Sequence, residues 1–407
     1  MDFRLTPAEE AFRSELKAWV AKELPEGTPV PSLNTWEDRA QAYKRWQRRL
    51  CEAGYAGIRI PKEYGGRGGT LMEEIIATEV LGPTAEAQGG GPEVVGHASV
   101  AAQGIAINVI LTCGTEEQKR AFIPGILDGS HIWCQAFSEP NNGSDAAGIS
   151  TFAKREGDHY IVNGQKIWTS FAHIADCCML LVRTNRQVPK HQGLSYLLLD
   201  MKAPGVEVRP IRQISGDSEF NEVFLTDVSI PANRLVGEED GGWKIAIATL
   251  MFERVMGDLK ASEAYGAEFE RMLRMAQGMK RGGRPVLQDP VVRQQVAQCY
   301  IELMALKYTG FRSASKIMKG QVPGPEGSIG KLLWSDAHVR LGDLAMQIQG
   351  PYHQLVEGSP LAIEDAVWQY VFLRSRGNTI ESGSSQIMRN ILGERVLGLP
   401  KDPVRGG

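Results

Sequence analysis

The sequence of 407 residues has no excess of charge of either sign. Its 45 lysines and arginines are balanced by 48 aspartates and glutamates, for a formal net charge of −3. Nothing in this balance argues for a nucleic-acid partner or an anionic membrane surface, since both recruit basic patches. With 43% hydrophobic and 23% charged residues, the composition is that of an ordinary globular protein and excludes disorder and fibrous repeats.

Cysteines are few, and none forms a Cys-x-x-Cys pair. The six are Cys51, Cys113, Cys134, Cys177, Cys178 and Cys299. In a chain of this length they indicate a reducing compartment rather than a disulfide framework. The seven histidines show no metal-ligand spacing, so no metal site is predicted.

Long apolar runs and a leader pattern are also missing. The start, Met1 to Pro7, has no basic segment followed by an apolar one, so no signal peptide is expected. The most apolar stretch, 98–113, is interrupted by Gln103, Gly104 and Asn108, and it falls short of the ~18 apolar residues of a membrane span. It predicts a buried helix. We therefore expect a cytoplasmic protein without membrane insertion.

The secondary-structure signals change twice along the chain. Up to residue 130 they are helical, with capping boxes at Thr6 and Thr115, a helix opened by Thr35 and another over 71–81. Short runs of β character follow, separated by turn signals. They lie at 151–154, 160–168, 179–183, 195–199, 206–210 and 221–230.

From Gly241 the helical pattern returns, in segments long enough for a bundle. These segments are 242–279, 289–319, 327–349, 360–377 and 384–394. The order predicts an α+β multi-domain fold with three parts. We expect an N-terminal α-helical domain over 1–131, a middle antiparallel β domain over 132–236 and a C-terminal four-helix-type bundle over 237–407.

Three segments could carry chemistry, although each alone is a weak signal. The turn in 133–145 is rich in Pro, Asn and Gly, and its N–H groups and hydroxyls can hold anionic oxygens, as nests do. The same residues also make ordinary surface turns. Segment 163–170 brings a tryptophan and two hydroxyls to a strand end, or is simply a hairpin with a core tryptophan. Segment 381–387 is a small-residue loop before a helix, where a serine N-cap is the plainer reading.

Taken in this order, the segments resemble those of the acyl-CoA dehydrogenase family over essentially the whole chain. Phe137–Asp145 is similar to the family's T-E-P-x-x-G-S-D flavin loop, with Ser138 where the family often has threonine. Lys166–Ser170 resembles its K-x-W-I-T segment. Residues 384–391 and the ending 394–400 resemble its C-terminal motifs. Four matches in the right order are a specific signal.

This resemblance implies FAD as cofactor, bound where the β domain meets the C-terminal bundle of two subunits. The implied cofactor contacts are Phe137, Ser138, Gly143, Ser144, Trp168, Thr169, Ser170, Ser384, Ser385 and Gln386, with Gln347 and Gly350 reaching in from a neighbouring subunit. Pro351 replaces the family's second glycine there. An arginine among 281–284 would meet the pyrophosphate. Implied contacts to acyl-CoA come from Ser144, Phe252, Arg254, Ser382 and Gly383.

The catalytic base departs from the commonest pattern of the family. Removing a weakly acidic α-proton requires a shielded carboxylate, and the thioester oxygen requires hydrogen-bond donors. Many members place a glutamate where this chain has Ser382, which cannot serve. Residues 251–255 resemble the isovaleryl and long-chain types, in which Glu253 matches the catalytic glutamate. A solvated helical glutamate is its plain alternative. Glu381 is the rival, but neighbours in an extended segment face opposite sides.

The resemblance thus implies α,β-dehydrogenation of an acyl-CoA thioester to a trans-2-enoyl-CoA. Glu253 would take the α-proton, FAD N5 would take the hydride, and an electron-transferring flavoprotein would reoxidise the cofactor. The family is usually a homotetramer, and a mixed tetramer is also open. Two other functions remain: an O₂-using flavin monooxygenase or oxidase of the same fold, and a partner subunit of a mixed tetramer. The sequence does not give the length, branching or ring content of the acyl chain.

Overall fold

The structure is a computed structural model that describes residues 4–25, 33, 35–82, 104–321 and 324–401, without the side chains of 252–258. The chain divides into two compact units. One comprises Met1–Arg212 and Ser218–Glu253, and the other Gln213–Asp217 and Arg254–Gly407.

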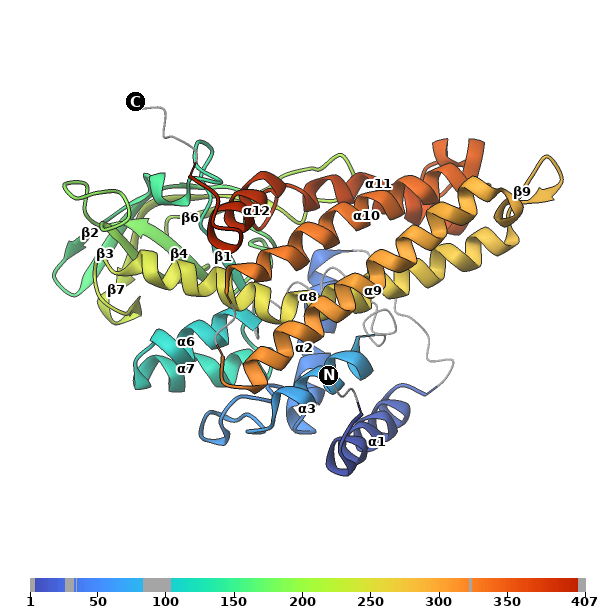
Figure 1. The fold of residues 1–407 in the computed structure, drawn as a ribbon. Helices are drawn as coiled ribbons and strands as arrows, with labels where there is room; N and C mark the ends of the chain where they lie inside the picture. The colour runs from blue at the N-terminus through green and yellow to red at the C-terminus, as the bar shows by residue number, and fades with distance from the viewer. Residues whose placement is uncertain (1–3, 26–32, 34, 83–103, 322–323, 402–407) are drawn as a thin grey trace. The chain divides into compact units, whose positions relative to one another are not determined.

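Helices make up the beginning of the first unit (Figure 1). They are α1 (Pro7–Glu23), α2 (Trp36–Glu52), α3 (Leu71–Leu81), α6 (Ile107–Cys113) and α7 (Glu116–Leu127). The capping boxes at Thr6 and Thr115 are confirmed, and in each the threonine oxygen accepts a bond from the third helical N–H. The apolar stretch 98–113 yields a helix from Ile107, whereas 98–103 lie outside the described residues.

A single sheet of eight strands follows. Its strands are β1 (Trp133–Ala136), β2 (Phe152–Glu156), β3 (His159–Lys166), β4 (Cys177–Arg183), β5 (Leu194–Asp200), β6 (Val206–Pro210), β7 (Asn221–Pro231) and β8 (Leu235–Val236). The spatial order is β6-β7-β3-β2-β4-β5-β8, and β1 pairs with β4. Both β1 and β2 run parallel to β4, so the antiparallel prediction is wrong for these pairs. Parallel neighbours need a connection of a dozen or more residues, which 137–176 provides between β1 and β4 and 157–176 provides between β2 and β4.

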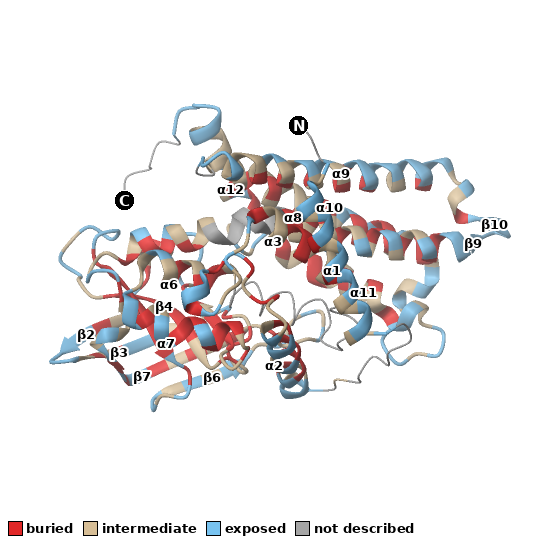
Figure 2. Ribbon diagram, turned by 90° about the horizontal axis from the view of Figure 1, so that it is seen from below, coloured by how far each residue is buried: buried red, intermediate tan, exposed pale blue. Residues whose placement is uncertain are grey.

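The middle of this sheet is buried on both faces. Alternate residues of β4 enter different apolar clusters: Met179 and Leu181 pack with the helices, whereas Leu180 and Val182 pack on the other side. Figure 2 shows β4 as buried along most of its length, while the end of β2 is exposed. A strand covered on both faces is apolar throughout rather than alternating, which is why β4 reads as one continuous run.

All six cysteines are free thiols. Cys134 of β1 and Cys178 of β4 lie opposite each other in the parallel register, and both are buried. Burial raises the pKa of the Cys134 thiol well above its ordinary value, with a smaller contribution from the neighbouring Cys178. Both thiols are therefore part of the apolar core in the folded chain.

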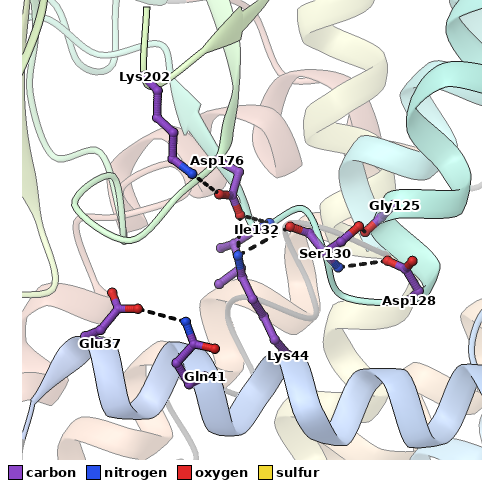
Figure 3. Close-up of polar contacts among 9 residues, drawn as sticks. All are labelled: Glu37, Gln41, Lys44, Gly125, Asp128, Ser130, Ile132, Asp176 and Lys202. Atoms are coloured by element: carbon purple, nitrogen blue, oxygen red, sulfur yellow. Dashed lines mark hydrogen bonds and ion pairs between the residues drawn. The ribbon is translucent and has the colours of Figure 1, made fainter.

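Asp176, just before β4, ties α2 to the sheet (Figure 3). Its carboxylate accepts bonds from Lys44 Nζ of α2 at 2.7 Å, from Lys202 Nζ at 3.0 Å and from the backbone N–H of Ile132 at 3.0 Å. Lys44 Nζ also donates to the carbonyl of Ser130. We call these residues the Asp176 cluster.

The second unit is a helical bundle. Its helices are the later part of α8 (Gly242–Gly278), α9 (Pro290–Met318), α10 (Ser328–Gln349), α11 (Val367–Asn378) and α12 (Ser385–Ile391), with a hairpin of β9 (Lys280–Arg281) and β10 (Arg284–Pro285). One apolar cluster joins Phe269 of α8, Leu303 of α9, Leu341 of α10 and Trp368 of α11. Within this unit α10 packs beside both α9 and α11 (Figure 1).

The helix expected over 360–377 begins later than predicted, at Val367. Glu364, Asp365 and Ala366 have φ values of 50°, 52° and 64°, in the left-handed region. Consecutive left-handed residues cannot continue a right-handed helix, so the turn before Val367 marks its start. Among the described residues, no helix combines the length and the apolar character that crossing a membrane requires.

Candidate functional site

The segment 137–145 leaves the end of β1 and folds into a tight turn. Glu139 and Asn142 exchange backbone hydrogen bonds of 2.9 and 3.0 Å, which closes the turn. Gly143 and Ser144 lie exposed beyond it, whereas the ring of Phe137 is buried edge-on against Tyr196. A flavin contact from Phe137 would therefore come from its backbone, and contacts from Gly143 and Ser144 would come from the surface of the turn.

This turn is joined to the second predicted segment by a buried ion pair. Lys166 Nζ donates to Glu139 Oε1 at 2.9 Å and to the carbonyl of Phe137 at 3.0 Å. The other donors to Glu139 are Ser150 and Thr151, so both carboxylate oxygens are bonded. Burial alone would raise the pKa of Glu139, but the charge of Lys166 and these donors outweigh it and lower the pKa to about 2. Burial lowers the pKa of Lys166 to about 8.

Residues 167–171 form a strained turn directly after β3. The strand expected over 160–168 ends at Lys166, and both Trp168 (φ 60°) and Phe171 (φ 59°) adopt the left-handed region. Non-glycine residues in this region cost about 1–3 kcal/mol each and are held by their surroundings, often at functional sites. The indole of Trp168 is 55% exposed and meets only the edge of Phe220 among the ring contacts of the described residues. This exposure excludes the plain alternative of a core tryptophan, and the predicted flavin contact of Trp168 stays a prediction.

Thr169 lies between these two strained residues and is held by Asn221. The two backbones exchange bonds of 3.0 and 3.1 Å, and the buried Asn221 side chain donates to the Thr169 carbonyl at 2.9 Å. The Thr169 hydroxyl oxygen is buried and has no hydrogen-bond partner within the described part of the chain. A buried hydroxyl of this kind needs a partner from outside those residues. Ser170, next along the turn, is half-buried.

The second unit carries the C-terminal segment. Ser382 (φ 52°) and Gly383 (φ 94°) turn the chain into α12. The φ of Gly383 strains any side chain, and a Cβ there would also approach the Met388 methyl to 2.5 Å, so glycine is favoured. Ser384 is the N-cap of α12 and accepts a bond from the N–H of Ile387, which confirms the capping reading.

The hydroxyl of Ser385 in this segment is buried without a hydrogen-bond partner in the described part, like that of Thr169. Gln386 beside it is exposed. Each of these two segments thus presents a buried hydroxyl without a hydrogen-bond partner among the described residues, which fits a group with hydrogen-bonding atoms bound at that segment.

Glu381, the rival base, is bound to an arginine. Its Oε2 accepts a bond of 3.1 Å from Arg374, which also donates to the side chain of Asn378. Asn378 in turn contacts His338, and His338 lies 2.8 Å from Glu268 of α8. The bond to a largely buried arginine holds the Glu381 carboxylate in place, which does not suit a base that must approach a substrate carbon.

The hairpin arginine meets the predicted subunit-contact segment. Arg281 Nη2 donates to the carbonyl of Gln347 at 2.7 Å, and Gly350 (φ 55°) follows in the turn that ends α10. Of the arginines considered near 281–284, Arg281 is thus the one joined to this segment. The sequence did not predict that contact, since 66 residues separate the two partners.

Phe252, Glu253 and Arg254 fall on α8, and their side chains lie outside the described residues. Their roles stay predictions. No group of three or more His, Cys, Asp or Glu side chains gathers as a metal site in the part that the structure describes.

Sequence reasoning missed the partners that hold the two segments of the first unit. Glu139 and Lys166 both lie within the family motifs, but the sequence carries no sign that they pair, since 27 residues separate them. Asn221 left no signal, because its role depends on the pairing of β7 with β3.

Family models match the chain along nearly its whole length. They are those for the acyl-CoA dehydrogenase N-terminal domain (residues 6–130), middle domain (134–228) and C-terminal domain (240–397). The acyl-CoA dehydrogenase IpdE1 of Mycolicibacterium smegmatis is 36% identical, over 97% of this chain and 98% of the relative. The Mycobacterium tuberculosis protein of the same name is also 36% identical, with the same coverage.

Two solved structures are similar throughout. The Tcur3481-Tcur3483 steroid ACAD is 26% identical with a TM-score of 0.81, covering 99% of this chain and 100% of that one. The ChsE4-ChsE5 complex from Mycobacterium tuberculosis is 29% identical with a TM-score of 0.79 and the same coverage. The expected order of a helical, a β-sheet and a second helical domain is confirmed by these matches.

Proposed function

Because this chain belongs to the acyl-CoA dehydrogenase family, we propose that it converts an acyl-CoA thioester to a trans-2-enoyl-CoA. It is an oxidoreductase of that type. The chief support is the 36% identity to a named acyl-CoA dehydrogenase across 97% of the chain, with no domain missing. Electrons would leave to an electron-transferring flavoprotein.

The cofactor of the family is FAD, which accepts a hydride at flavin N5 when bound. In this chain the buried hydroxyls of Thr169 and Ser385 and the exposed indole of Trp168 fit such a group. Ser138, Gly143, Ser144 and Ser170 would add backbone and hydroxyl contacts. Ser384 and Gln386 would lie at the adenosine phosphates, and Gln347 and Gly350, with Arg281 bonded to Gln347, would reach the cofactor of a neighbouring subunit.

Glu253 is the proposed base, which removes the α-proton of the thioester. Ser382 would polarise the thioester oxygen through its backbone N–H, where enolate charge develops. The bond from Arg374 to Glu381 supports this choice, since it occupies the rival carboxylate. Phe252, Arg254 and Gly383 would contact the acyl-CoA.

For the acyl group we propose a ring-bearing chain, because one solved relative is described as a steroid ACAD. Two of the solved relatives carry two component names, so the assembly is either a tetramer of this chain or a mixed one. Mass spectrometry of the complex purified from its native cell distinguishes these by the presence of a second chain.

The reaction is tested by anaerobic titration of the purified protein with straight, branched and ring-bearing acyl-CoAs, following the flavin absorbance. We expect one thioester to bleach the wild type, and Glu253→Gln to bind it while bleaching about 10²–10⁴-fold more slowly, since that is the usual contribution of a general base. Glu270→Gln, an exposed glutamate on the same helix, is the matched control and should bleach at the normal rate.

Bleaching of Glu253→Gln at the wild-type rate would exclude Glu253 as the base. Steady O₂ consumption without bleaching would favour the monooxygenase or oxidase alternative. A second chain that restores bleaching would identify a partner subunit.

A further inference from the structure

The ion pair between Lys166 and Glu139 is enclosed on all sides within the first unit. The Lys166 side chain is fully buried and that of Glu139 is 4% exposed. The groups that face Lys166 are Glu139 and the Phe137 carbonyl, with Cys178 and Arg183 of β4 acting at longer range. Water cannot replace any of these contacts, so the geometry of the pair is fixed by the protein alone.

A pair of this kind is not explained by stability. Taking both charges out of water costs about as much as their attraction returns, and well-packed apolar side chains of similar volume are often as stable or more so. An apolar side chain at position 166, however, could not donate a hydrogen bond to the carbonyl of Phe137.

The pair lies where the two segments expected to contact flavin meet. Lys166 is two residues before Trp168, and its ammonium holds Phe137 and Glu139 of the other segment. The backbone N–H of Ile167 donates to the Ser138 carbonyl at 3.0 Å, beside the pair. Glu139 is fixed in turn by Ser150 and Thr151. The left-handed backbone of Trp168 thus lies only two residues after this buried ion pair.

We propose that Lys166 and Glu139 are positioning residues that set the flavin-facing atoms of Phe137 and Ser138 in register with Trp168 and Thr169. This inference rests on the proposed function, in that it assumes FAD as the cofactor. The pair does not touch the flavin. It acts through the Phe137 carbonyl on one side and through the strained turn on the other.

The test compares three variants with the wild type. Lys166→Met removes both the charge and the donor to Phe137. Glu139→Gln removes the negative charge but leaves an amine that can still donate to the Phe137 carbonyl. Lys44→Met is the matched control, because it breaks a lysine–aspartate pair of the same unit in the Asp176 cluster, whose bonds involve neither segment (Figure 3).

Each protein is stripped of FAD, and three quantities are measured: the FAD dissociation constant, the flavin absorbance spectrum and the flavin midpoint potential. We expect Lys166→Met to weaken FAD binding at least tenfold and to move both the spectrum and the potential. Glu139→Gln should weaken binding about threefold, and Lys44→Met should change none of the three.

An FAD dissociation constant, spectrum and potential in Lys166→Met equal to those of wild type would overturn the proposal. Should Lys166→Met fail to fold, wild-type values in Glu139→Gln would overturn it equally. If the wild-type apoprotein itself binds no FAD, the proposed function fails instead, so the two failures are distinguishable.

Discussion

Glu139 and Asp176 each hold distant segments of the first unit together, but the two carboxylates and their partners differ in burial. Each carboxylate accepts a backbone N–H and a lysine ammonium, and each joins segments far apart in the chain. At Glu139 both side chains of the ion pair are enclosed. Asp176 is 15% exposed, its partner Lys44 is 23% exposed and Lys202 is 77% exposed.

The difference shows that burial, more than the number of bonds, decides how a junction responds to change. Near water, a lost partner is replaced by solvent, and exposed pairs contribute about 0–1 kcal/mol. Inside the protein, a lost partner leaves a charge that nothing replaces, which costs about 3–5 kcal/mol. We therefore expect substitutions at the Glu139–Lys166 pair to destabilise the protein strongly, and substitutions in the Asp176 cluster to be tolerated.

The largest expected effect is that of Lys166→Met on the free energy of unfolding. The substitution leaves Glu139 buried without its cation, so we expect a loss of about 3–5 kcal/mol in urea unfolding. Lys154→Met, which breaks the exposed pair with Glu156 on β2, is the control and should lose less than about 1 kcal/mol. Equal losses in the two variants would show that enclosure of the pair has no bearing on stability.

A smaller effect is expected from acid. The pKa of Glu139 in the folded chain is about 2, below its ordinary 4.5, so its contribution to stability is complete above pH 4.5 and is lost as the pH falls toward 2. Between pH 5 and pH 3 the wild type should lose roughly 2 kcal/mol more than Glu139→Gln does.

For Asp176 the pKa is also lowered, because the donors from Ile132, Lys44 and Lys202 outweigh the opposing effect of burial. The contribution of Asp176 to stability is therefore also lost as the pH falls.

The measurement for the Glu139 prediction is urea unfolding of wild type and Glu139→Gln at pH 5 and pH 3. A steeper acid dependence in Glu139→Gln than in wild type would contradict the assignment.

The smallest effects should separate the two lysines of the Asp176 cluster. Lys44 is mostly buried and also donates to Ser130, so Lys44→Met should cost about 1 kcal/mol. Lys202 is largely exposed, so Lys202→Met should cost less than about 0.5 kcal/mol. Thermal unfolding of both variants against wild type measures the difference. A greater loss from Lys202→Met would contradict the inference that the more buried lysine contributes more to stability.

Much of the fold was predictable because its signals are local. The threonine caps at Thr6 and Thr115 and the turn residues between β2 and β3 act within a few residues of their own positions. The parallel pairing of β1 with β4 was not predictable, since it depends on a partner more than 40 residues away. The left-handed turn at Glu364–Ala366 was missed for the opposite reason, because its residue types are ordinary in helices.

The candidate site likewise has parts that the sequence predicts and parts that it does not. Ser384 as a helix cap follows from its neighbours, and the structure confirms it. The left-handed backbone of Trp168 does not follow from local residue types, and its neighbour Thr169 is held by Asn221, which is distant in the sequence. The side chain of Glu253 is the part on which the proposed reaction most depends, and it stays a prediction.

The facing thiols of Cys134 and Cys178 have a consequence for chemical labelling. They lie in neighbouring strands and both are buried. Burial also raises the pKa of the Cys134 thiol, which suppresses the thiolate that an alkylating reagent attacks. Alkylation at these two positions therefore requires the apolar cluster that encloses both thiols to open. The rate at which these two cysteines acquire label, measured peptide by peptide, therefore reports how often the sheet core opens in the otherwise native molecule.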